Sequence, residues 1–213
     1  MKIKYLAHAS FLITADDGTK VITDPYKAGD GFKYGAITGS ADIVTMSHEH
    51  GDHNYADGIG GNPEIVKGSA TVKGITIKAV PTAHDDKGGS ERGPNNVMCF
   101  VVSGVRVVHL GDLGHLLTDN QVVEIGKVHV LLVPVGGHFT IDAGAAKEVA
   151  DQVRARVIIP MHYKTDKCEL PINGVDEFLK ARDNVTMVDG SEVEFTVPKL
   201  PSSPQIMVLK PSL

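Results

Sequence analysis

The chain has 213 residues, of which 42% are hydrophobic, and its formal net charge is -5 with the histidines neutral. This length and apolar content suffice for one sizeable core, so we expect a single domain over residues 1–213. The negative charge and the lack of a basic run argue against nucleic acid as a partner.

The first half of the chain is predicted to be rich in strands. Residues 3–14, "IKYLAHASFLIT", and 20–25, "KVITDP", flank the turn "DDGT" and indicate a hairpin. A Gly-rich loop over 29–40 precedes a short buried strand at 41–47, "ADIVTMS". The next predicted segments are one or two strands within 71–84, a polar Gly-rich loop at 81–96, and two strands within 97–112.

The second half alternates between strands and helices. A short helix is predicted at 117–126 with Thr118 as its N-cap, and buried strands are predicted at 128–137 and 155–163. Residues 140–154 have helical spacing, with an apolar side formed by Ile141, Ala145, Val149 and Val153. The last predicted segments are a helix at 173–182, strands at 184–190 and 191–197, and a tail at 198–213 that is either an edge strand or partly ordered. This interleaving indicates an α/β layered fold.

Residues able to bind metal follow the predicted strands. The stretch "MSHEHGDHNY" places four of them within six positions, and others follow later strands: His48, His50, Asp52, His53, His84, Asp112 and His162. Side chains at strand ends can converge on one edge of a sheet. Imidazole nitrogens and carboxylate oxygens are ligands of zinc and similar divalent ions. The sequence therefore predicts a metal site.

The motif "HEHGDH" resembles the H-x-H-x-D-H signature of the metallo-β-lactamase superfamily. "HASFLI" with "VITDP" resembles its opening hairpin and first Asp motif, while "PTAH", "HLGDLG" and "PMHY" resemble later motifs in the same order. "GGHFT" and "MHY" are similar to the ascorbate-6-phosphate lactonase group and its uncharacterised relatives. The resemblance implies a four-layer αβ/βα sandwich, with two mixed sheets flanked by helices and metals at one edge of the sheets.

The resemblance also implies two metal sites. The first ion would be held by His48, His50 and His84, and the second by Asp52, His53 and His162. Asp112 would bridge both ions. Zinc is the expected metal, with manganese or iron as alternatives.

A charge count and two-metal chemistry suggest what such a site would do. Two divalent ions outweigh Asp52, Asp112 and a bridging hydroxide by about one charge, so a small anionic substrate is favoured. Paired ions lower the pKa of a shared water and supply hydroxide at neutral pH, which would attack a lactone, ester or phosphodiester. Asp52 and Asp112 are therefore the expected catalytic residues.

Several other residues are candidates for supporting roles. His138 in "GGHFT" is a third catalytic candidate, either touching substrate or stabilising an oxyanion. Asp24 resembles the first Asp of the superfamily and would orient a ligand. For three further residues, contact with substrate or with the site and plain packing both stay open: His8 in the first strand, His115 and Tyr163.

Three residues near the ligands are given other roles. His109 is a rival for the third ligand of the first ion, but strand alternation points it away from Asp112, which favours His84. Asp85 and Asp86 are interpreted as solvated loop charges, and the alternative is that one of them braces the site.

The leading hypothesis is a metal-dependent hydrolase. A diiron redox enzyme is disfavoured because that branch of the superfamily carries Glu where His50 stands and because no flavin domain follows. An RNA-processing nuclease is disfavoured by the net charge and the lack of an inserted binding arm. A thiolesterase of the glyoxalase type would need a C-terminal helical domain, and a non-catalytic metal-binding protein would leave a complete ligand set without use.

The remaining expectations concern location. The opening "MKIKYLAHASFLIT" lacks the features of a signal peptide, and no apolar run is long enough to span a membrane. Two separate cysteines, Cys99 and Cys168, predict no disulfide framework. We expect a cytoplasmic protein without a membrane partner, and a homo-oligomer stays possible.

Overall fold

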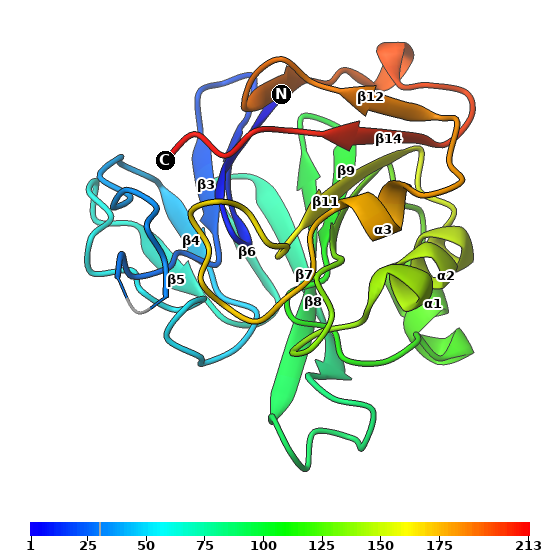
Figure 1. Ribbon diagram of the computed structural model, residues 1–213. Helices are drawn as coiled ribbons and strands as arrows, with labels where there is room; N and C mark the ends of the chain where they lie inside the picture. Colours follow the sequence, from blue (N-terminus) through cyan, green and yellow to red (C-terminus); the bar gives the residue numbers. More distant parts are fainter. Residues whose placement is uncertain (30) are drawn as a thin grey trace.

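Two β-sheets pack face to face in the computed structural model, which describes residues 1–29 and 31–213 (Figure 1). The first sheet has six strands, in the order β13 (Glu192–Glu194), β1 (Lys2–Ala7), β2 (Ser10–Thr14), β3 (Lys20–Thr23), β4 (Ile43–Thr45) and β5 (Glu64–Val66). The second sheet has eight strands, in the order β12 (Val185–Met187), β14 (Gln205–Val208), β11 (Val157–Met161), β10 (Val130–Pro134), β9 (Val105–His109), β8 (Pro94–Val102), β7 (Ile75–Ala83) and β6 (Ala70–Val72). Both sheets are mixed, since each contains parallel and antiparallel pairs.

Alternation along the strands of the first sheet gives it two buried faces. Val21 and Ile43 belong to the core between the sheets, whereas the next residues, Ile22 and Val44, belong to a second apolar cluster on the outer face. Successive side chains of a strand point to opposite faces, so both residues of each pair can be buried. Segments 24–29, 31–42 and 46–63 cover the outer face, with Tyr26, Phe32, Tyr34, Ile37 and Ile59 in the cluster.

The helices of the described residues lie by the second sheet (Figure 1). These are α1 (Asp119–Ile125), α2 (Ala143–Val153) and α3 (Asp176–Leu179), with a 3-10 turn at Val197–Lys199. The predicted cap of the first is confirmed, because Thr118 accepts a hydrogen bond from the Gln121 amide and Gln121 caps it in return. In α2, Val149 and Val153 are buried on one side, as the helical spacing predicted.

The predicted α/β sandwich of two mixed sheets is confirmed, but its outer layers are unequal. Irregular segments rather than helices cover the outer face of the six-stranded sheet in the described residues. The predicted loop over 29–40 is largely irregular as expected, and its residue Asp30 lies outside the described residues.

Three details of the predicted elements were wrong. The run 3–14 is not one strand, because the chain turns at His8, which has a φ of 55° between β1 and β2. The loop predicted at 81–96 is shorter, since Pro81 pairs with Asn96 in the ladder of β7 and β8. The tail forms no edge strand, because β14 lies between β11 and β12.

Within the described residues, no helix combines the length and the apolar character needed to cross a bilayer.

Candidate metal centre

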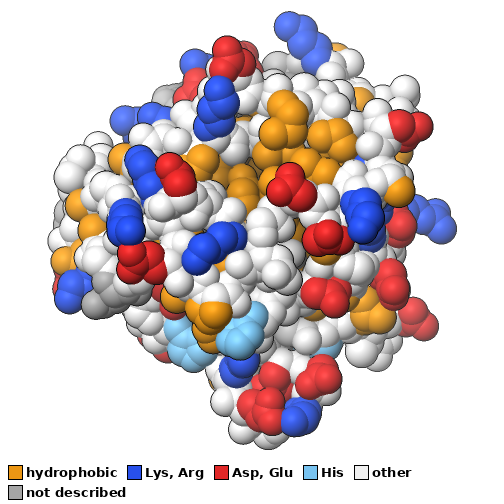
Figure 2. All heavy atoms as spheres, viewed as in Figure 1, with side chains coloured by type: hydrophobic (Ala, Val, Ile, Leu, Met, Phe, Trp, Pro, Cys, Tyr) orange, Lys and Arg blue, Asp and Glu red, His pale blue; other side chains and the backbone are white. Residues whose placement is uncertain are grey.

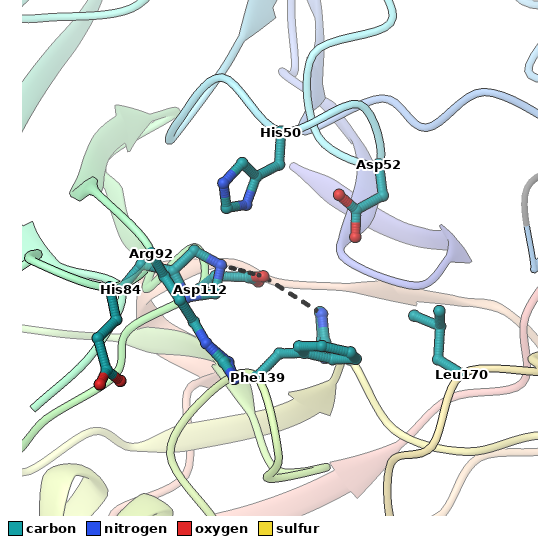
Figure 3. Close-up of a pocket in the computed structure, with 9 residues that line it drawn as sticks. His50, Asp52, His84, Arg92, Asp112, Phe139 and Leu170 are labelled. Carbon is teal, nitrogen blue, oxygen red and sulfur yellow. Dashed lines mark ion pairs between the residues drawn. The ribbon is translucent and has the colours of Figure 1, made fainter.

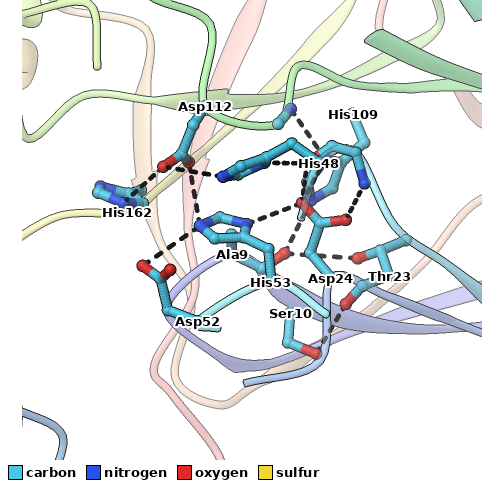
Figure 4. A network of polar contacts seen from close by, with 12 residues as sticks. Ala9, Ser10, Thr23, Asp24, His48, Asp52, His53, His109, Asp112 and His162 are labelled. Carbon is cyan, nitrogen blue, oxygen red and sulfur yellow. Dashed lines mark hydrogen bonds and ion pairs between the residues drawn. The ribbon is translucent and has the colours of Figure 1, made fainter. Parts of the chain in front are cut away.

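The seven predicted metal ligands come from both sheets. His48, His50, Asp52 and His53 follow β4 of the six-stranded sheet. The other three, His84, Asp112 and His162, follow β7, β9 and β11 of the eight-stranded sheet. The structure brings all seven together at one edge of the sandwich (Figures 3 and 4).

Two groups of ligand-type atoms have a carboxylate between them, and a third group joins Asp24 to His48 and His53. His48, His50 and His84 offer atoms that lie within 4.8 Å of one another, and Asp52, His53 and His162 do so together with His8. Asp112 Oδ2 lies 3.2 Å from His84 Nε2 in the first group. The same oxygen lies 3.3 Å from His162 Nε2 in the second group, and Oδ1 lies 3.2 Å from His53 Nε2.

Several buried polar atoms of this cluster have no hydrogen-bond partner in the described part of the chain. They include His48 Nε2, His53 Nε2 and Asp112 Oδ1. Buried polar atoms are normally paired, so these call for an explanation. Divalent cations would supply the missing partners, and a donor set rich in imidazole with a few carboxylates is typical of zinc. The residues present therefore fit a metal centre.

Asp24 and Ser47 fix the tautomers of two of these histidines. The Asp24 carboxylate accepts hydrogen bonds from the Ser47 amide at 2.8 Å, from the Ser47 hydroxyl at 2.5 Å and from His53 Nδ1 at 2.9 Å. Because the Ser47 hydroxyl donates to Asp24, its oxygen accepts from His48 Nδ1 at 2.9 Å. Both rings thus carry a proton on Nδ1, and their Nε2 atoms face Asp112 (Figure 4).

Burial lowers the pKa of three histidines of the cluster, His8, His48 and His50. Burial and the neighbouring His53 lower the pKa of His48 to about 3. Burial and His162 lower the pKa of His8 to about 4. Burial also lowers the pKa of His53, but Asp112 and Asp52 outweigh it and raise that pKa well above the usual value. A cation arriving at His53 Nε2 would therefore have to displace a proton.

His109 is close to the centre but does not offer a free nitrogen. Its Nδ1 accepts from the Gly111 amide at 3.0 Å, so Nε2 carries the proton and donates to the Ala9 carbonyl at 2.7 Å. Both ring nitrogens are therefore engaged with the backbone. His84 belongs to a group that could hold a metal ion, whereas His109 bonds the backbone through both ring nitrogens.

The predicted supporting residues differ in where they lie. Besides Asp24, His8 is next to the centre, and its Nε2 donates to Asp52 Oδ2 at 3.2 Å. His115 accepts from the Ala83 amide and bonds the Leu116 carbonyl, which fixes the end of β7. Tyr163 packs into the core, with its hydroxyl 3.4 Å from the Leu209 carbonyl. His138 is exposed, and its ring packs edge-on against Phe139.

A cavity of about 360 Å³ opens beside the metal centre (Figure 3). The lining includes ligand-type residues, two apolar side chains and two charged side chains of the loop after β7. The lining residues are His50, Asp52, His84, Glu91, Arg92, Asp112, Phe139, His162 and Leu170. On one face of the molecule, histidine side chains reach the surface next to hydrophobic ones (Figure 2).

Sequence reasoning missed the residues that shape this cavity. Asp85 is buried rather than solvated, and its carboxylate accepts from the amides of Lys87, Gly89, Glu91 and Arg92 at 2.7 to 2.9 Å. These hydrogen bonds lower the pKa of Asp85 well below its usual value despite the opposing effect of burial. An Asp ahead of a Gly-rich loop often bonds the amides that follow, and that signal could have identified Asp85. Asp86, in contrast, is exposed as predicted.

The comparisons with known proteins agree with this geometry. Residues 2–162 match the family model described as a β-lactamase superfamily domain. A solved structure from Thermotoga maritima, described as a candidate zinc-dependent hydrolase of the metallo-β-lactamase superfamily, is 40% identical with a TM-score of 0.82. It covers 98% of this chain, which covers 97% of it.

Two proteins that are less similar in sequence are also described as metal-dependent or metallo hydrolases. A UPF0173 metal-dependent hydrolase from Carboxydothermus hydrogenoformans is 32% identical over 78% of this chain and 85% of its own length. A metallo hydrolase from Ignicoccus hospitalis, at 21% identity, covers 99% of this chain and 95% of its own with a TM-score of 0.68, and so is similar in fold.

The chain therefore belongs to the metallo-β-lactamase superfamily, as its motifs indicated. Its relatives carry the name of metal-dependent hydrolases, and the chain has groups of His and Asp side chains that could hold a metal ion. The protein is a metal-dependent hydrolase.

Proposed function

We propose that the protein is a dinuclear zinc hydrolase of a small anionic metabolite, with a lactone, ester or phosphodiester bond as its target. The observation that carries the proposal is the position of the Asp112 carboxylate. One of its oxygens lies within 3.3 Å of both His84 and His162, which belong to different ligand groups. A carboxylate in that position can serve two cations at once.

The proposed ligand sets follow the two groups. His48, His50 and His84 would hold one ion, and Asp52, His53 and His162 the other, with Asp112 shared. A pair of bound zinc ions would lower the pKa of a water molecule, so that hydroxide is available at neutral pH. The ions would also polarise the bond that the hydroxide attacks.

The protein's own groups hold that arrangement in place. Asp24 accepts a hydrogen bond from His53 Nδ1 and, through Ser47, orients His48. His8 donates to Asp52 and keeps one oxygen of that carboxylate fixed. These contacts need no rearrangement when the ligands engage a cation, which favours a preorganised centre.

The cavity supports a small substrate. Its volume of about 360 Å³ suits a metabolite rather than a polymer, and Phe139 and Leu170 give it an apolar side. We propose no nucleic-acid or membrane partner for it, and a lactonase-like reaction is one member of the substrate class. His138 stays a catalytic candidate, since the loop that carries it borders the cavity through Phe139.

A cytoplasmic location is part of the proposal. Cys99 and Cys168 are both free, Cys168 is buried, and Cys99 is partly covered. Free thiols persist in a reducing compartment.

The test is metal analysis by mass spectrometry, followed by a screen of lactones, esters, phosphodiesters and thioesters on the same sample. Two zinc ions per chain and hydrolysis in one class are expected. The variant Asp112→Ala should lose bound metal and turnover, while Asp119→Ala, at an exposed helix start, should keep both. An Asp112→Ala protein with two metals and full turnover would overturn the dinuclear proposal.

Other outcomes identify other functions. Bound iron with turnover of O₂ or NO would indicate a redox enzyme, and salt-sensitive RNA cleavage would indicate a nuclease. A protein loaded with both metals that hydrolyses nothing in the screen would argue against the proposed substrate class.

A further inference from the structure

We infer that Arg92 forms an oxyanion subsite of the cavity, which binds a carboxylate or phosphate of the substrate separate from the group that is hydrolysed. This inference rests on the proposed function, because it assigns part of the substrate of the same site. It also predicts a substrate with at least two polar ends.

The position of Arg92 at the cavity wall is fixed by contacts of both its side chain and its backbone. Its guanidinium donates to the His138 carbonyl at 3.0 Å and lies 5.1 Å from the centre of the Phe139 ring (Figure 3). Its backbone amide donates to the buried carboxylate of Asp85 at 2.8 Å. An arginine fixed at both ends loses little freedom when it binds an anion, and its remaining N–H groups suit an oxyanion with two oxygens.

Arg92 is also available for an anion. Within residues 1–29 and 31–213, the contacts of its guanidinium are with a carbonyl and an aromatic ring, and none is with a carboxylate. Its neighbour Glu91 pairs with Lys87 instead. Among the described residues that line the cavity, Arg92 is the one Lys or Arg side chain.

The net charge of the metal centre decides how much Arg92 contributes to binding an anionic substrate. Asp24 is fully buried against His53 and lies behind the ligand shell, so its negative charge adds to those of Asp52 and Asp112. Three carboxylates and a hydroxide would cancel two divalent ions, which leaves the centre about neutral. Net attraction for a second anionic group of the substrate then comes from Arg92.

The alternative is that Arg92 only braces the loop of His138 and Phe139. The two roles differ in what a variant would do. Loss of a brace should weaken every ligand of the cavity, whereas loss of an oxyanion subsite should weaken only ligands with the second anionic group.

The experiment compares matched ligands on the zinc-loaded protein by calorimetry. Phosphonoacetate, 3-phosphonopropionate and 4-phosphonobutyrate are each paired with the alkylphosphonate of the same chain length that lacks the carboxylate. For at least one spacer, the carboxylate should tighten binding about 10- to 100-fold in the wild type. A second series with two phosphonates shows which oxyanion is preferred.

The variants assign that gain to Arg92. Arg92→Met should abolish the gain in affinity from the carboxylate. Arg92→Lys should keep part of this gain, since the charge remains but the bidentate hydrogen bonding is lost. Lys127→Met removes an exposed positive charge outside the cavity lining and should leave the gain unchanged.

Three results would overturn the inference: no carboxylate gain with any spacer, a full gain in Arg92→Met, or equal weakening of both members of a pair in that variant. None of these readouts depends on turnover, so failure of the hydrolase screen and failure of this subsite are distinguishable.

Discussion

Nδ1 of His53 donates a hydrogen bond of 2.9 Å to the carboxylate of Asp24, and the Asp24 side chain is fully buried. This contact selects the His53 tautomer whose Nε2 faces Asp112 at 3.2 Å. The same carboxylate governs His48 through Ser47, so one residue outside the ligand set orients a ligand of each proposed ion.

We predict that Asp24→Asn weakens zinc binding about 10- to 100-fold, the range seen when carboxylates behind metal-bound histidines are replaced. Asn tolerates the left-handed backbone of this position, where φ is 38°, so the fold should persist. A chelator competition titration measures the affinity, and circular dichroism checks the fold. Asp42→Asn, which alters a carboxylate at the start of β4, is the control. An unchanged zinc affinity in Asp24→Asn would refute the orienting role.

The second prediction concerns the loop after β7. Asp85→Asn replaces two accepting oxygens by one, so some of the four amides from Lys87 to Arg92 lose their partner. We expect trypsin to cleave after Lys87 and Arg92 several-fold faster while zinc binding is retained, as followed by mass spectrometry. Asp86→Asn changes the exposed neighbour and should cleave like the wild type. Equal cleavage rates in the two variants would show that Asp85 does not hold the loop.

A third prediction tests how closely the ligand loops approach each other. A Cβ at Gly114 would lie 2.3 Å from the Asp85 amide nitrogen and from the His84 carbonyl carbon, both of which are backbone atoms. Gly114→Ala should therefore force the His84 and Asp112 loops apart, cost about 1–3 kcal/mol of unfolding free energy and weaken zinc binding. Denaturant unfolding and the chelator titration measure the two effects. At Gly68 a Cβ meets nothing within 4 Å, so Gly68→Ala should leave zinc binding as it is; the same result for Gly114→Ala would contradict the close approach.

The ligand cluster could be predicted because its residues are chemically distinctive and follow strands whose apolar runs are easy to identify. Four of them, His48 to His53, are also adjacent in sequence, so their proximity needs no knowledge of tertiary structure. His84, Asp112 and His162 required the further assumption that strand ends meet at one edge, and the eight-stranded sheet meets that assumption.

Direction was harder to predict than proximity. Tyr163 and His115 are close in sequence to ligands, yet Tyr163 points into the core and His115 bonds the backbone at the end of β7. Arg92 lies in a loop without periodicity, where nothing in the sequence relates its side chain to the cavity. Asp85 precedes the Gly-rich part of that loop, which favours hydrogen bonds to the amides that follow, but only the folded loop reveals which four amides it binds.

A local turn and a strand segment that pairs on only one side account for the errors in the predicted fold. "LAHAS" contains no Gly, Pro, Asn or Asp, so the turn at His8 gave no signal. Pro81 suggested a loop, but it lies beyond the part of β7 that pairs with β6, where a missing N–H is tolerated.

The last prediction separates the proposed metal chemistry from thiol chemistry. Burial raises the pKa of Cys99 to about 11, and it also raises the pKa of Cys168. Because the thiolate is the nucleophile, a raised pKa leaves less of it at any pH below that pKa. Alkylation of Cys99 by iodoacetamide at pH 7.5 should be about 100-fold slower in the native protein than in the unfolded chain. Its rate should rise about tenfold per pH unit up to the highest pH at which the protein stays folded. Peptide mass spectrometry follows each cysteine separately, and pretreatment with iodoacetamide at pH 7.5 should leave zinc content and turnover unchanged. Rapid native alkylation with loss of turnover would instead make a cysteine part of the reaction.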